Sequence, residues 1–448
     1  MSWVLVLGVV SLVALQVTIS SQSQSAHDPG VRSGDAGAGA ALPGLTAQQN
    51  EYFVAGREDF AEAEEVGAGI GPRMNLDSCG GCHSQPAIGG TSPAVNPQVA
   101  FATLGRDTVP SFLSPNGPVR EARFVKNADG TPDGGVHALF TISGRGGAQG
   151  CSLKQDDFET QVANHNVIFR IPTPTFGAGL IEQIPDAAIL ANVTANAAAK
   201  GSLGIRGRAN FQVIGRTVTG QSNNNGNDGT IARFGWKAQN KSLLIFSGEA
   251  YNVEMGITNE LFMTEREESS KCQYSATPNS IGDLDAADPT VAMSSIEKFA
   301  LFMRFLAPPA TSTTTPGGAT SIANGKSVFS STGCVLCHTA SFTTASSRVA
   351  ALSSKPVDLF SDLLVHDMGD ALADGIGQGQ ASGREFRTAP LWGLGQRIFF
   401  LHDGRTSDLV AAIRAHASNG SEASATIDNY NNLSEQQKQD LLNFLRSL

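Results

Sequence analysis

The sequence predicts a mainly α-helical protein built from two tandem domains of similar design, the first enlarged by a long loop- and β-rich insertion. Three observations lead to this prediction. The pentapeptide pattern C-x-x-C-H occurs at residues 79–83 and again at residues 334–338. A G-x-x-x-F pattern precedes each copy, at residues 56–60 and 325–329, and an apolar segment rich in Phe and Leu closes each half. Because matching patterns recur in the same order, the chain reads as a duplicated unit.

The C-x-x-C-H pattern is the attachment signature of c-type haem. Its two thiols add across the two vinyl groups of one porphyrin, and the adjacent histidine then binds the iron. A CxxC zinc site or a thioredoxin-like site is the alternative, but it lacks a second cysteine pair nearby and leaves two following histidines unexplained. We therefore predict two covalently bound haem c groups in two cytochrome-c-like domains. The residues concerned are Cys79, Cys82 and His83 in the first domain, and Cys334, Cys337 and His338 in the second.

Residues 1–26 are expected to form a signal peptide or an N-terminal anchor. An apolar run covers residues 4–19 and small polar residues follow it, but no basic residue precedes Arg32, so an uncleaved membrane anchor stays open. Either way the body of the chain is expected outside the cytoplasm, in the periplasm of a bacterium, where haem is attached to thiols. Residues 27–44 are rich in Gly, Ala, Ser and Asp and are expected to be a flexible tether.

The first haem domain is expected at residues 45–307. From about residue 100 to residue 230 (100–230), the sequence pattern consists of short β-like runs separated by polar turns. Two of these runs, 123–125 and 137–142, flank an N-A-D-G hairpin signal. Residues 221–229 are rich in Asn and Gly and are expected to form an exposed loop. This stretch is too long for a minimal cytochrome and is therefore interpreted as an insertion.

The second haem domain is expected at residues 319–448. The helical pattern that ends the first domain stops at two consecutive prolines, 308 and 309. A Thr-, Pro- and Gly-rich linker then covers residues 308–318. The chain closes with a helix whose N-cap is Ser434.

Charge and composition narrow the class of partner. The 448 residues carry a net charge of -10, and the sequence pI is about 5.3. This balance argues against nucleic acid and against an anionic membrane surface, so membrane contact is expected only through the N-terminal segment. An acidic face could instead attract a basic redox partner.

Two of the six cysteines, Cys151 and Cys272, are not used by the haem pattern. In an oxidising compartment such a pair is expected to form a structural disulfide that closes a long loop. A redox-active pair is the alternative, but the two residues are not in a CxxC arrangement.

Several further segments carry a family resemblance: GPRMN at 71–75, RFGWKA at 233–238, NVEMG at 252–256, LWGLG at 391–395 and LHDGR at 401–405. As a set they resemble the bacterial di-haem cytochrome c peroxidase superfamily. Within it they look most like the di-haem oxidoreductase group, which is described as peroxidase-like and often labelled thiol oxidoreductase. The likeness covers about residues 45–448. It implies two haems packed close together, a reactive one in the first domain and an electron-storing one in the second.

The resemblance implies roles for two residues of the first domain. Glu254 aligns with the carboxylate on the distal side of the reactive haem, which moves a proton between the two peroxide oxygens. A solvated glutamate at a helix end is the alternative. Trp236 aligns with the tryptophan that relays electrons between the haems, but the local motif is shifted, so a core tryptophan is the alternative.

The second haem needs a distal ligand. In the relatives it is a Met in a helix shortly after the LHDGR-like segment, and here that stretch ends at His416. His416 is therefore the expected distal ligand of the second haem. The alternative is that His416 is a surface histidine of an amphipathic helix, and Met368 is the other candidate ligand. Replacing His/Met ligation by His/His ligation would lower the haem potential.

The first haem is expected to keep an open or water-filled sixth position. Residues 84–136 contain no histidine, whereas relatives that rest in an inactive state carry one there. His137 and His165 could fold back onto this haem from the insertion.

Three other sites follow from the resemblance. Trp392 is expected to pack against the second haem. His402 and Asp403 are expected near a haem edge, and Arg405 is expected to neutralise a propionate.

The sequence is therefore consistent with two functions. In the first, peroxide or O2 reacts at the first haem, and electrons arrive through the second haem from a small redox protein or a quinol-linked chain. In the second, the protein is a non-enzymatic electron-transfer cytochrome with both haems six-coordinate. Thiol oxidation has no support beyond the spare cysteine pair. The sequence leaves open whether a calcium ion lies between the domains, and the insertion is expected to select the oxidisable substrate.

Overall fold

The computed structural model describes residues 25–211, 217–218, 221–222, 231–266 and 268–448. Most of the predicted signal peptide or anchor and most of the Asn- and Gly-rich loop lie outside these ranges. Within the described ranges, no helix has both the length and the apolar character needed to cross a membrane.

The helices of the described residues are mostly short. The α-helices are α1 (Ala47–Ala61), α2 (Cys79–Cys82), α3 (Pro97–Gly105), α4 (Phe158–Ala163), α5 (Ala178–Glu182), α6 (Asp186–Thr194), α7 (Ala197–Leu203), α8 (Leu243–Met255), α9 (Pro289–Ala292), α10 (Ser295–Phe305), α11 (Gly318–Thr332), α12 (Leu409–Arg414), α13 (Ser424–Asn431) and α14 (Glu435–Ser447). Single 3-10 turns are η1 (Val66–Ala68), η2 (Ser270–Cys272), η3 (Cys334–Leu336) and η4 (Leu394–Gln396).

The strands form small antiparallel sheets. The three-stranded sheet has the order β3-β2-β5, and the two-stranded pairs are β1-β4, β6-β9, β7-β8, β10-β11 and β12-β13. Their bounds are β1 (Arg73–Met74), β2 (Glu121–Phe124), β3 (Val136–His137), β4 (Phe140–Thr141), β5 (Val167–Arg170), β6 (Asn210–Phe211), β7 (Thr217–Val218), β8 (Gln221–Ser222), β9 (Ile231–Ala232), β10 (Phe342–Thr343), β11 (Pro356–Val357), β12 (Val365–Asp367) and β13 (Glu385–Arg387).

The fold class is mixed rather than mainly α. The described part of the chain has 14 α-helices and several small sheets, and it is about 34% helical. The prediction of a mainly α-helical protein is therefore only partly right. Long connecting segments satisfy their backbone groups through turns and strand pairs of two to four residues, which leave little periodic signal in the sequence.

The same helix pair occurs twice, once in residues 45–307 (the first unit) and once in residues 319–448 (the second unit). In the first unit α1 packs on α10, where Gly56 lies against the Lys298 carbonyl. In the second unit α11 packs on α14, where Gly325 lies against the Asp440 carbonyl. A Cβ atom at either glycine would collide with backbone, so each glycine permits a close helix crossing.

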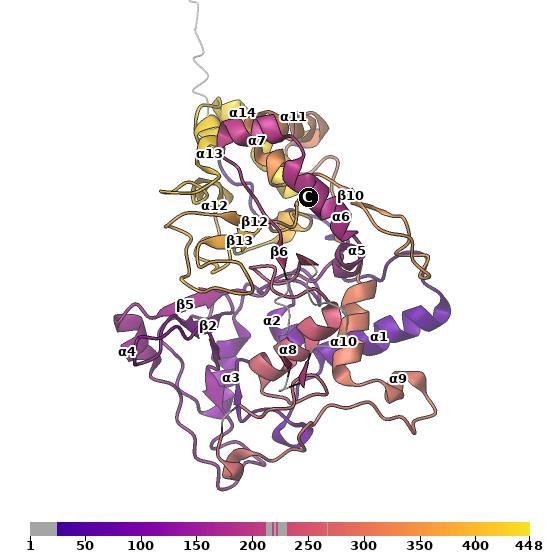
Figure 1. Cartoon of the computed structure of the whole chain (residues 1–448), viewed down its shortest axis with the longest axis vertical. Helices are drawn as coiled ribbons and strands as arrows, with labels where there is room; N and C mark the ends of the chain where they lie inside the picture. The colour runs from indigo at the N-terminus through magenta and orange to yellow at the C-terminus, as the bar shows by residue number, and fades with distance from the viewer. Residues whose placement is uncertain (1–24, 212–216, 219–220, 223–230, 267) are drawn as a thin grey trace, which may run out of the picture.

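A repeated antiparallel strand pair accompanies the repeated helix pair. Strands β2 and β5 place Ala122 opposite Phe169, and strands β12 and β13 place His366 opposite Phe386. The sequence Phe169-Arg170 on β5 thus has a counterpart in Phe386-Arg387 on β13. In Figure 1 the second unit, orange to yellow, lies above the first unit, and α5, α6 and α7 of the insertion reach up against it.

Residues 25–44 run along both units, and we call them the N-terminal strap. Arg32 is buried: its backbone N–H donates to the Gly395 carbonyl at 2.7 Å and its Nη1 to the Ser447 carbonyl at 3.0 Å. Leu42 is buried too, and its N–H donates to the Phe305 carbonyl at 2.7 Å. We expected a flexible tether here; instead the segment is packed, because a few of its residues find partners at the ends of α10 and α14.

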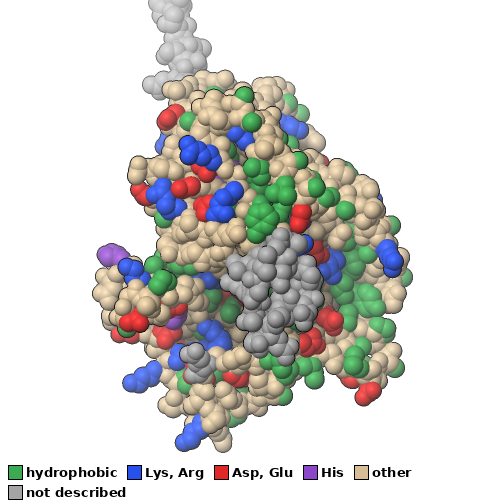
Figure 2. All heavy atoms as spheres, viewed as in Figure 1, with side chains coloured by type: hydrophobic (Ala, Val, Ile, Leu, Met, Phe, Trp, Pro, Cys, Tyr) green, Lys and Arg blue, Asp and Glu red, His purple; other side chains and the backbone are tan. Residues whose placement is uncertain are grey.

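One part of the surface combines apolar and acidic side chains. Ile281, Leu284 and Val291, on the segment around α9, are exposed to 57%, 96% and 58%. Figure 2 shows hydrophobic and acidic side chains together over the region where α9 and α10 lie in Figure 1.

Candidate functional site

The first pentapeptide lies on a short helix at the wall of a deep cavity. Helix α2 is capped by Ser78, whose Oγ accepts a hydrogen bond from the Gly81 N–H at 3.4 Å. Cys79, Cys82 and His83 all line this first cavity. Two thiols and one imidazole at a common cavity fit a haem held by the C-x-x-C-H pattern.

His83 is arranged as an iron ligand should be. Its Nδ1 lies 3.0 Å from the Gly90 carbonyl oxygen, which fits a proton on Nδ1. Burial lowers the pKa of His83 to about 4, so the imidazole is neutral at pH 7, which is the form that binds metal. Phe60, the phenylalanine of the first G-x-x-x-F pattern, packs edge-on against this ring with centroids 5.9 Å apart.

A pair of carboxyl groups lines the same cavity. Glu254, near the end of α8, is hydrogen-bonded to Glu121 of β2, and its Oε2 accepts a hydrogen bond from Asn75 Nδ2 at 2.8 Å. Glu121 is ion-paired with the buried Arg123. The family resemblance pointed to Glu254, whereas Glu121 and Arg123 were not predicted. Charged residues at positions 121 and 123, two apart around the start of a β-like run and hence on one face, were the available signal.

The pKa values of these two carboxyls are driven apart. Burial and the neighbouring Glu121 charge raise the pKa of Glu254 well above its usual range. Burial tends to raise the pKa of Glu121, but the positive charges of Arg123 and Arg170, together with the hydrogen bonds that Glu121 makes, outweigh burial and the net shift is downward. The pair therefore holds one proton, on Glu254, next to one negative charge, on Glu121.

The second pentapeptide lines a second cavity. Cys334, Cys337 and His338 all face it. The His338 Nδ1 lies 2.9 Å from the Phe360 carbonyl oxygen, and burial lowers the His338 pKa to about 4. Phe329, the phenylalanine of the second G-x-x-x-F pattern, lies 6.2 Å from the His338 ring. The proximal arrangement of the first cavity is thus repeated.

Both candidates for the second distal ligand, His416 and Met368, line the second cavity. The His416 Nδ1 lies 2.8 Å from the Ala412 carbonyl oxygen, one turn back along α12, which leaves Nε2 free as in His338. Burial lowers the His416 pKa, so its imidazole is neutral. His416 is part of the cavity wall, and the orientation of its ring favours it over Met368.

Two arginines of the second cavity lack acidic partners. Arg387 and Arg397 both line it, and within the described residues neither forms an ion pair with a carboxylate. Burial lowers the pKa of each to about 10, so both stay charged at pH 7. Buried cations require anions, and haem propionates are anions. These two arginines are thus placed to meet propionates inside the cavity, whereas Arg405, for which that role was expected, is exposed and paired with Asp403 at 2.7 Å.

A buried histidine that the sequence analysis did not select also lines the second cavity. His366 Nε2 lies 3.0 Å from Asp362 Oδ2, and its Nδ1 lies 2.9 Å from Glu422 Oε2 and 3.6 Å from Cys337 Sγ. Two carboxylates therefore hold this ring beside the second pentapeptide. Because its partners come from three separate segments, no local sequence motif predicts that His366 lines this cavity.

Trp236 stands in the wall between the two cavities and lines both. Its Nε1 donates to the Ile171 carbonyl at 2.9 Å, and the Ile171 N–H donates to the His402 carbonyl at 2.8 Å. His402 lines the second cavity, 6.4 Å from the Trp236 ring and stacked on Phe386 at 4.2 Å. The shared wall is therefore made of aromatic rings and one backbone hydrogen-bond chain.

A buried positive charge lies next to this wall. The Lys237 ammonium donates to the carbonyls of Ser382 and Glu385, each at 2.9 Å, and lies 3.0 Å from Asp374 Oδ1. It also lies 3.9 Å from the Phe386 ring centroid. Burial lowers the pKa of Lys237 to about 8. Lys237 thus occupies a cage of oxygens between the units.

Other residues expected near a haem lie elsewhere. His137 pairs with Asp133 at 2.8 Å in the insertion, and His165 is exposed at a turn, so neither reaches the first cavity. Trp392 is buried in the main core against Gly177 and lines a smaller pocket instead of the second cavity. Asp403 likewise lies behind His402, outside the cavity lining. In the described part of the chain no cluster of three or more His, Cys, Asp or Glu has the arrangement of a metal site.

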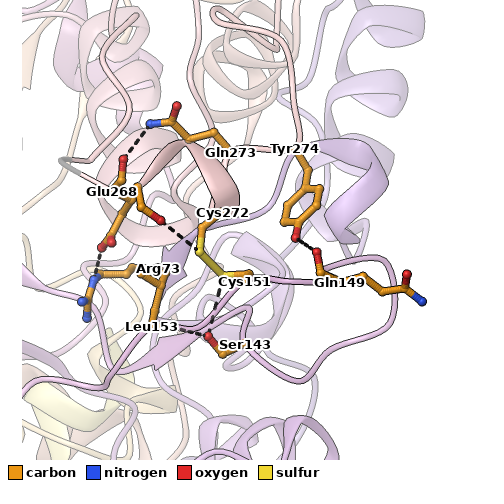
Figure 3. Close-up of a disulfide and its surroundings, with 10 residues drawn as sticks. Arg73, Ser143, Gln149, Cys151, Leu153, Glu268, Cys272, Gln273 and Tyr274 are labelled. Carbon is orange, nitrogen blue, oxygen red and sulfur yellow. Dashed lines mark hydrogen bonds and ion pairs between the residues drawn. A yellow bond between two sulfur atoms is a disulfide. The ribbon is translucent and has the colours of Figure 1, made fainter.

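Cys151 and Cys272 form a disulfide that links the insertion to the segment before α9 (Figure 3). Their Cα atoms are 4.8 Å apart, across 121 positions of sequence. Glu268, four residues before Cys272, forms an ion pair with Arg73 of β1. The Arg266 Nη1 donates to the Val253 carbonyl at 2.7 Å, directly before Glu254. The disulfide therefore fixes the segment that supports the carboxyl pair.

Taken together, the site defines a protein with two adjacent cofactor cavities separated by one tryptophan. The sequence model of one family, described as "di-haem oxidoreductase, putative peroxidase", matches residues 123–448. The chain belongs to this di-haem oxidoreductase family, as its motifs indicated. The match includes the second pentapeptide and the segments around Trp236 and Glu254, and it begins after the first pentapeptide.

Other comparisons add little. No curated protein matches the chain. Among solved structures, a chain of Kuenenia stuttgartiensis hydrazine synthase pressurised with 20 bar xenon is 18% identical, with a TM-score of 0.22. The match covers 36% of this chain and 56% of that chain. A likeness this weak supports no statement about fold or function.

Proposed function

We propose that the protein is an exported c-type cytochrome that acts as a peroxidase-like oxidoreductase. Two haems would be attached covalently, the first to Cys79 and Cys82 and the second to Cys334 and Cys337. When bound, the haem iron supplies the redox centre and a coordination site for peroxide or O2. Electrons would come from a small redox protein or a quinol-linked chain and enter through the second haem.

The observation that carries this proposal is the difference between the two cavities. The second has an imidazole with a free Nε2 on His338 and another on His416, which together would fill both axial positions. Among the described residues lining the first cavity, His83 is the one histidine, and the carboxyl pair lies there too. One cavity thus suits electron storage and the other suits chemistry on a bound oxygen compound.

The carboxyl pair supplies the acid–base chemistry that O–O cleavage needs. Glu121, held ionised by Arg123, can accept a proton from peroxide, and Glu254, held neutral, can donate one to the departing oxygen. Asn75 fixes the Glu254 carboxyl with a hydrogen bond at 2.8 Å. Trp236, which lines both cavities, would carry the electron between them.

Glu254→Gln tests the proposal. The amide keeps the hydrogen bond to Asn75 but cannot give up a proton in the same way. We expect cyanide to bind one haem per chain in both proteins, because an anion needs only the open axial position. We expect the peroxide-induced change of the Soret band, followed by stopped flow, to be about 10²–10⁴ times slower in the variant.

Glu249→Gln is the matched control, because Glu249 lines the same cavity but is bonded to Asn240. It should leave the peroxide rate nearly unchanged. If cyanide binds neither haem and peroxide changes no spectrum, both haems are six-coordinate and the protein is an electron carrier. An equal loss of rate in the Glu249 and Glu254 variants would remove the acid–base role from Glu254.

A further inference from the structure

A tyrosine connects the first cavity to the protein surface. Tyr251, in α8, is 3% exposed and lines the first cavity together with Cys79. Its ring packs edge-on against Phe299, with centroids 5.0 Å apart. Its hydroxyl donates to Glu64 Oε1 at 2.7 Å. This hydrogen bond leads away from the cavity, toward the segment between α1 and η1.

Glu64 is the outer end of this connection. It is half-buried, and its neighbours Glu62 and Glu65 are exposed. Burial raises the pKa of Glu64, and the hydrogen bond from Tyr251 acts in the opposite direction. Burial raises the pKa of the Tyr251 hydroxyl as well, so this phenol stays protonated at pH 7 and is a donor to the carboxylate.

The pair has the chemistry of a redox-active tyrosine. Removing an electron from a phenol makes its proton strongly acidic, so oxidation is favourable only where a base takes the proton at once. Tyr251 has such a base in hydrogen-bond contact. Tyr430 gives the contrast: it is 1% exposed in the second unit, and its hydroxyl has no hydrogen-bond partner within the described residues.

We propose that Tyr251 and Glu64 form a proton-coupled redox pair that carries electrons from a donor at the protein surface into the first cavity. The inference rests on the proposed function, because the oxidant is the first haem after its reaction with peroxide. In the step, Tyr251 loses one electron to that oxidant and its hydroxyl proton passes to the Glu64 carboxylate. A neutral tyrosyl radical and a protonated Glu64 result.

The cycle closes when a one-electron donor at the surface reduces the radical. The phenoxyl oxygen of Tyr251 then takes the proton back from Glu64, so the pair returns to its starting state. The route differs from the one through Trp236, because it does not involve the second cavity. It would let a reductant too large to enter the first cavity react from the surface around Glu64.

The test uses the full-length protein with both haems, in a background that isolates one tyrosine. The chain has four tyrosines, so Tyr52, Tyr274 and Tyr430 are replaced by Phe to leave Tyr251 as the single tyrosine. The protein is grown with ring-deuterated tyrosine or with ordinary tyrosine and oxidised in two ways. One oxidant is hydrogen peroxide. The other is photogenerated ruthenium(III) tris-bipyridine, which acts without any reaction of peroxide at a haem.

The readout is the EPR spectrum of the freeze-quenched sample. With both oxidants we expect an organic radical whose ring-proton splitting collapses on deuteration, and we expect it to be lost when Tyr251→Phe is added. A protein that keeps only Tyr430 is the matched control and should give no such signal. Glu64→Gln should lower the radical yield strongly, because an amide accepts a hydrogen bond but takes no proton, and Glu64→Asp should restore part of it.

The two arms separate this inference from the proposed function. No tyrosyl signal from the Tyr251 protein under ruthenium oxidation would overturn the redox pair, whatever peroxide does. A signal that Glu64→Gln leaves unchanged would overturn the proton-acceptor role. A signal with ruthenium but none with peroxide would support the pair and count against peroxide chemistry at the first haem.

Discussion

Breaking the Cys151–Cys272 disulfide should destabilise the protein by an amount that its position in the chain determines. The bridge closes a loop of 121 residues. In the chain-entropy model, losing a loop of this length costs about 4.9 kcal/mol at 25 °C. With a urea m value of about 3 kcal/mol per molar, the midpoint of unfolding should fall by about 1.6 M.

The assay compares three proteins by far-UV circular dichroism in urea: oxidised wild type, wild type reduced with dithiothreitol, and the double variant Cys151→Ala/Cys272→Ala. The reduced wild type keeps both buried sulfur atoms and loses only the bridge. The double alanine variant loses their packing as well, because Cys272 is 1% and Cys151 is 9% exposed. It should therefore unfold at slightly lower urea than the reduced protein.

Thioether bonds to haem are not cleaved by dithiothreitol, so the cofactors stay in place in all three samples. If the reduced wild type unfolds within about 1 kcal/mol of the oxidised protein, the loop argument is refuted. The unfolded chain would then already be restricted by other means, such as attached haem.

Three further changes test other parts of the structure. Gly325→Ala should destabilise the protein by about 1–3 kcal/mol, because its Cβ would collide with the backbone of α14, whereas Gly201→Ala in the open face of α7 should be neutral or slightly stabilising in the same urea assay. His416→Ala should convert the second haem to a high-spin spectrum; an unchanged low-spin spectrum would transfer ligation to the methionine in the same cavity. The peroxide rate should fall as pH rises through the elevated pKa of Glu254, since the acid form is then lost. Glu121→Gln removes the negative neighbour that raises this pKa, so the alkaline fall should move to lower pH; an unshifted profile would show that another group titrates.

Local patterns in the sequence were sufficient to predict much of the fold and of the candidate site. Each C-x-x-C-H pentapeptide is a continuous stretch of sequence. The residues of the two haem-attachment sites could therefore be predicted from ten positions alone. The repeated glycines Gly56 and Gly325 indicated a duplicated unit, and the structure places each at a close helix crossing that only a residue without a side chain allows. The family-like segments pointed to Trp236 and Glu254, and both residues line the first cavity.

What could not be predicted depends on partners far apart in the chain. Glu121 could be assigned to the site only because the fold places it next to Glu254. Arg387 could be assigned only because it has no acidic partner among the described residues. The N-terminal strap was misjudged from its Gly- and Ala-rich composition, because Arg32 finds its carbonyl partners near the far end of the chain. The strands of two to four residues were underestimated for a similar reason, since their pairing is not local.

The N-terminal strap also determines when the fold can be completed. Asp28 accepts hydrogen bonds from Arg446 at 2.6 and 2.7 Å, across 418 positions of sequence, and Arg446 is 1% exposed. A contact between residues so far apart in sequence has a high loop-closure cost, so we expect it to form late in folding. Without this contact the strap loses a buried anchor, and its amino end becomes open to proteases. Truncating the last helix should therefore expose the opposite terminus to digestion while leaving the α1–α10 pair protected.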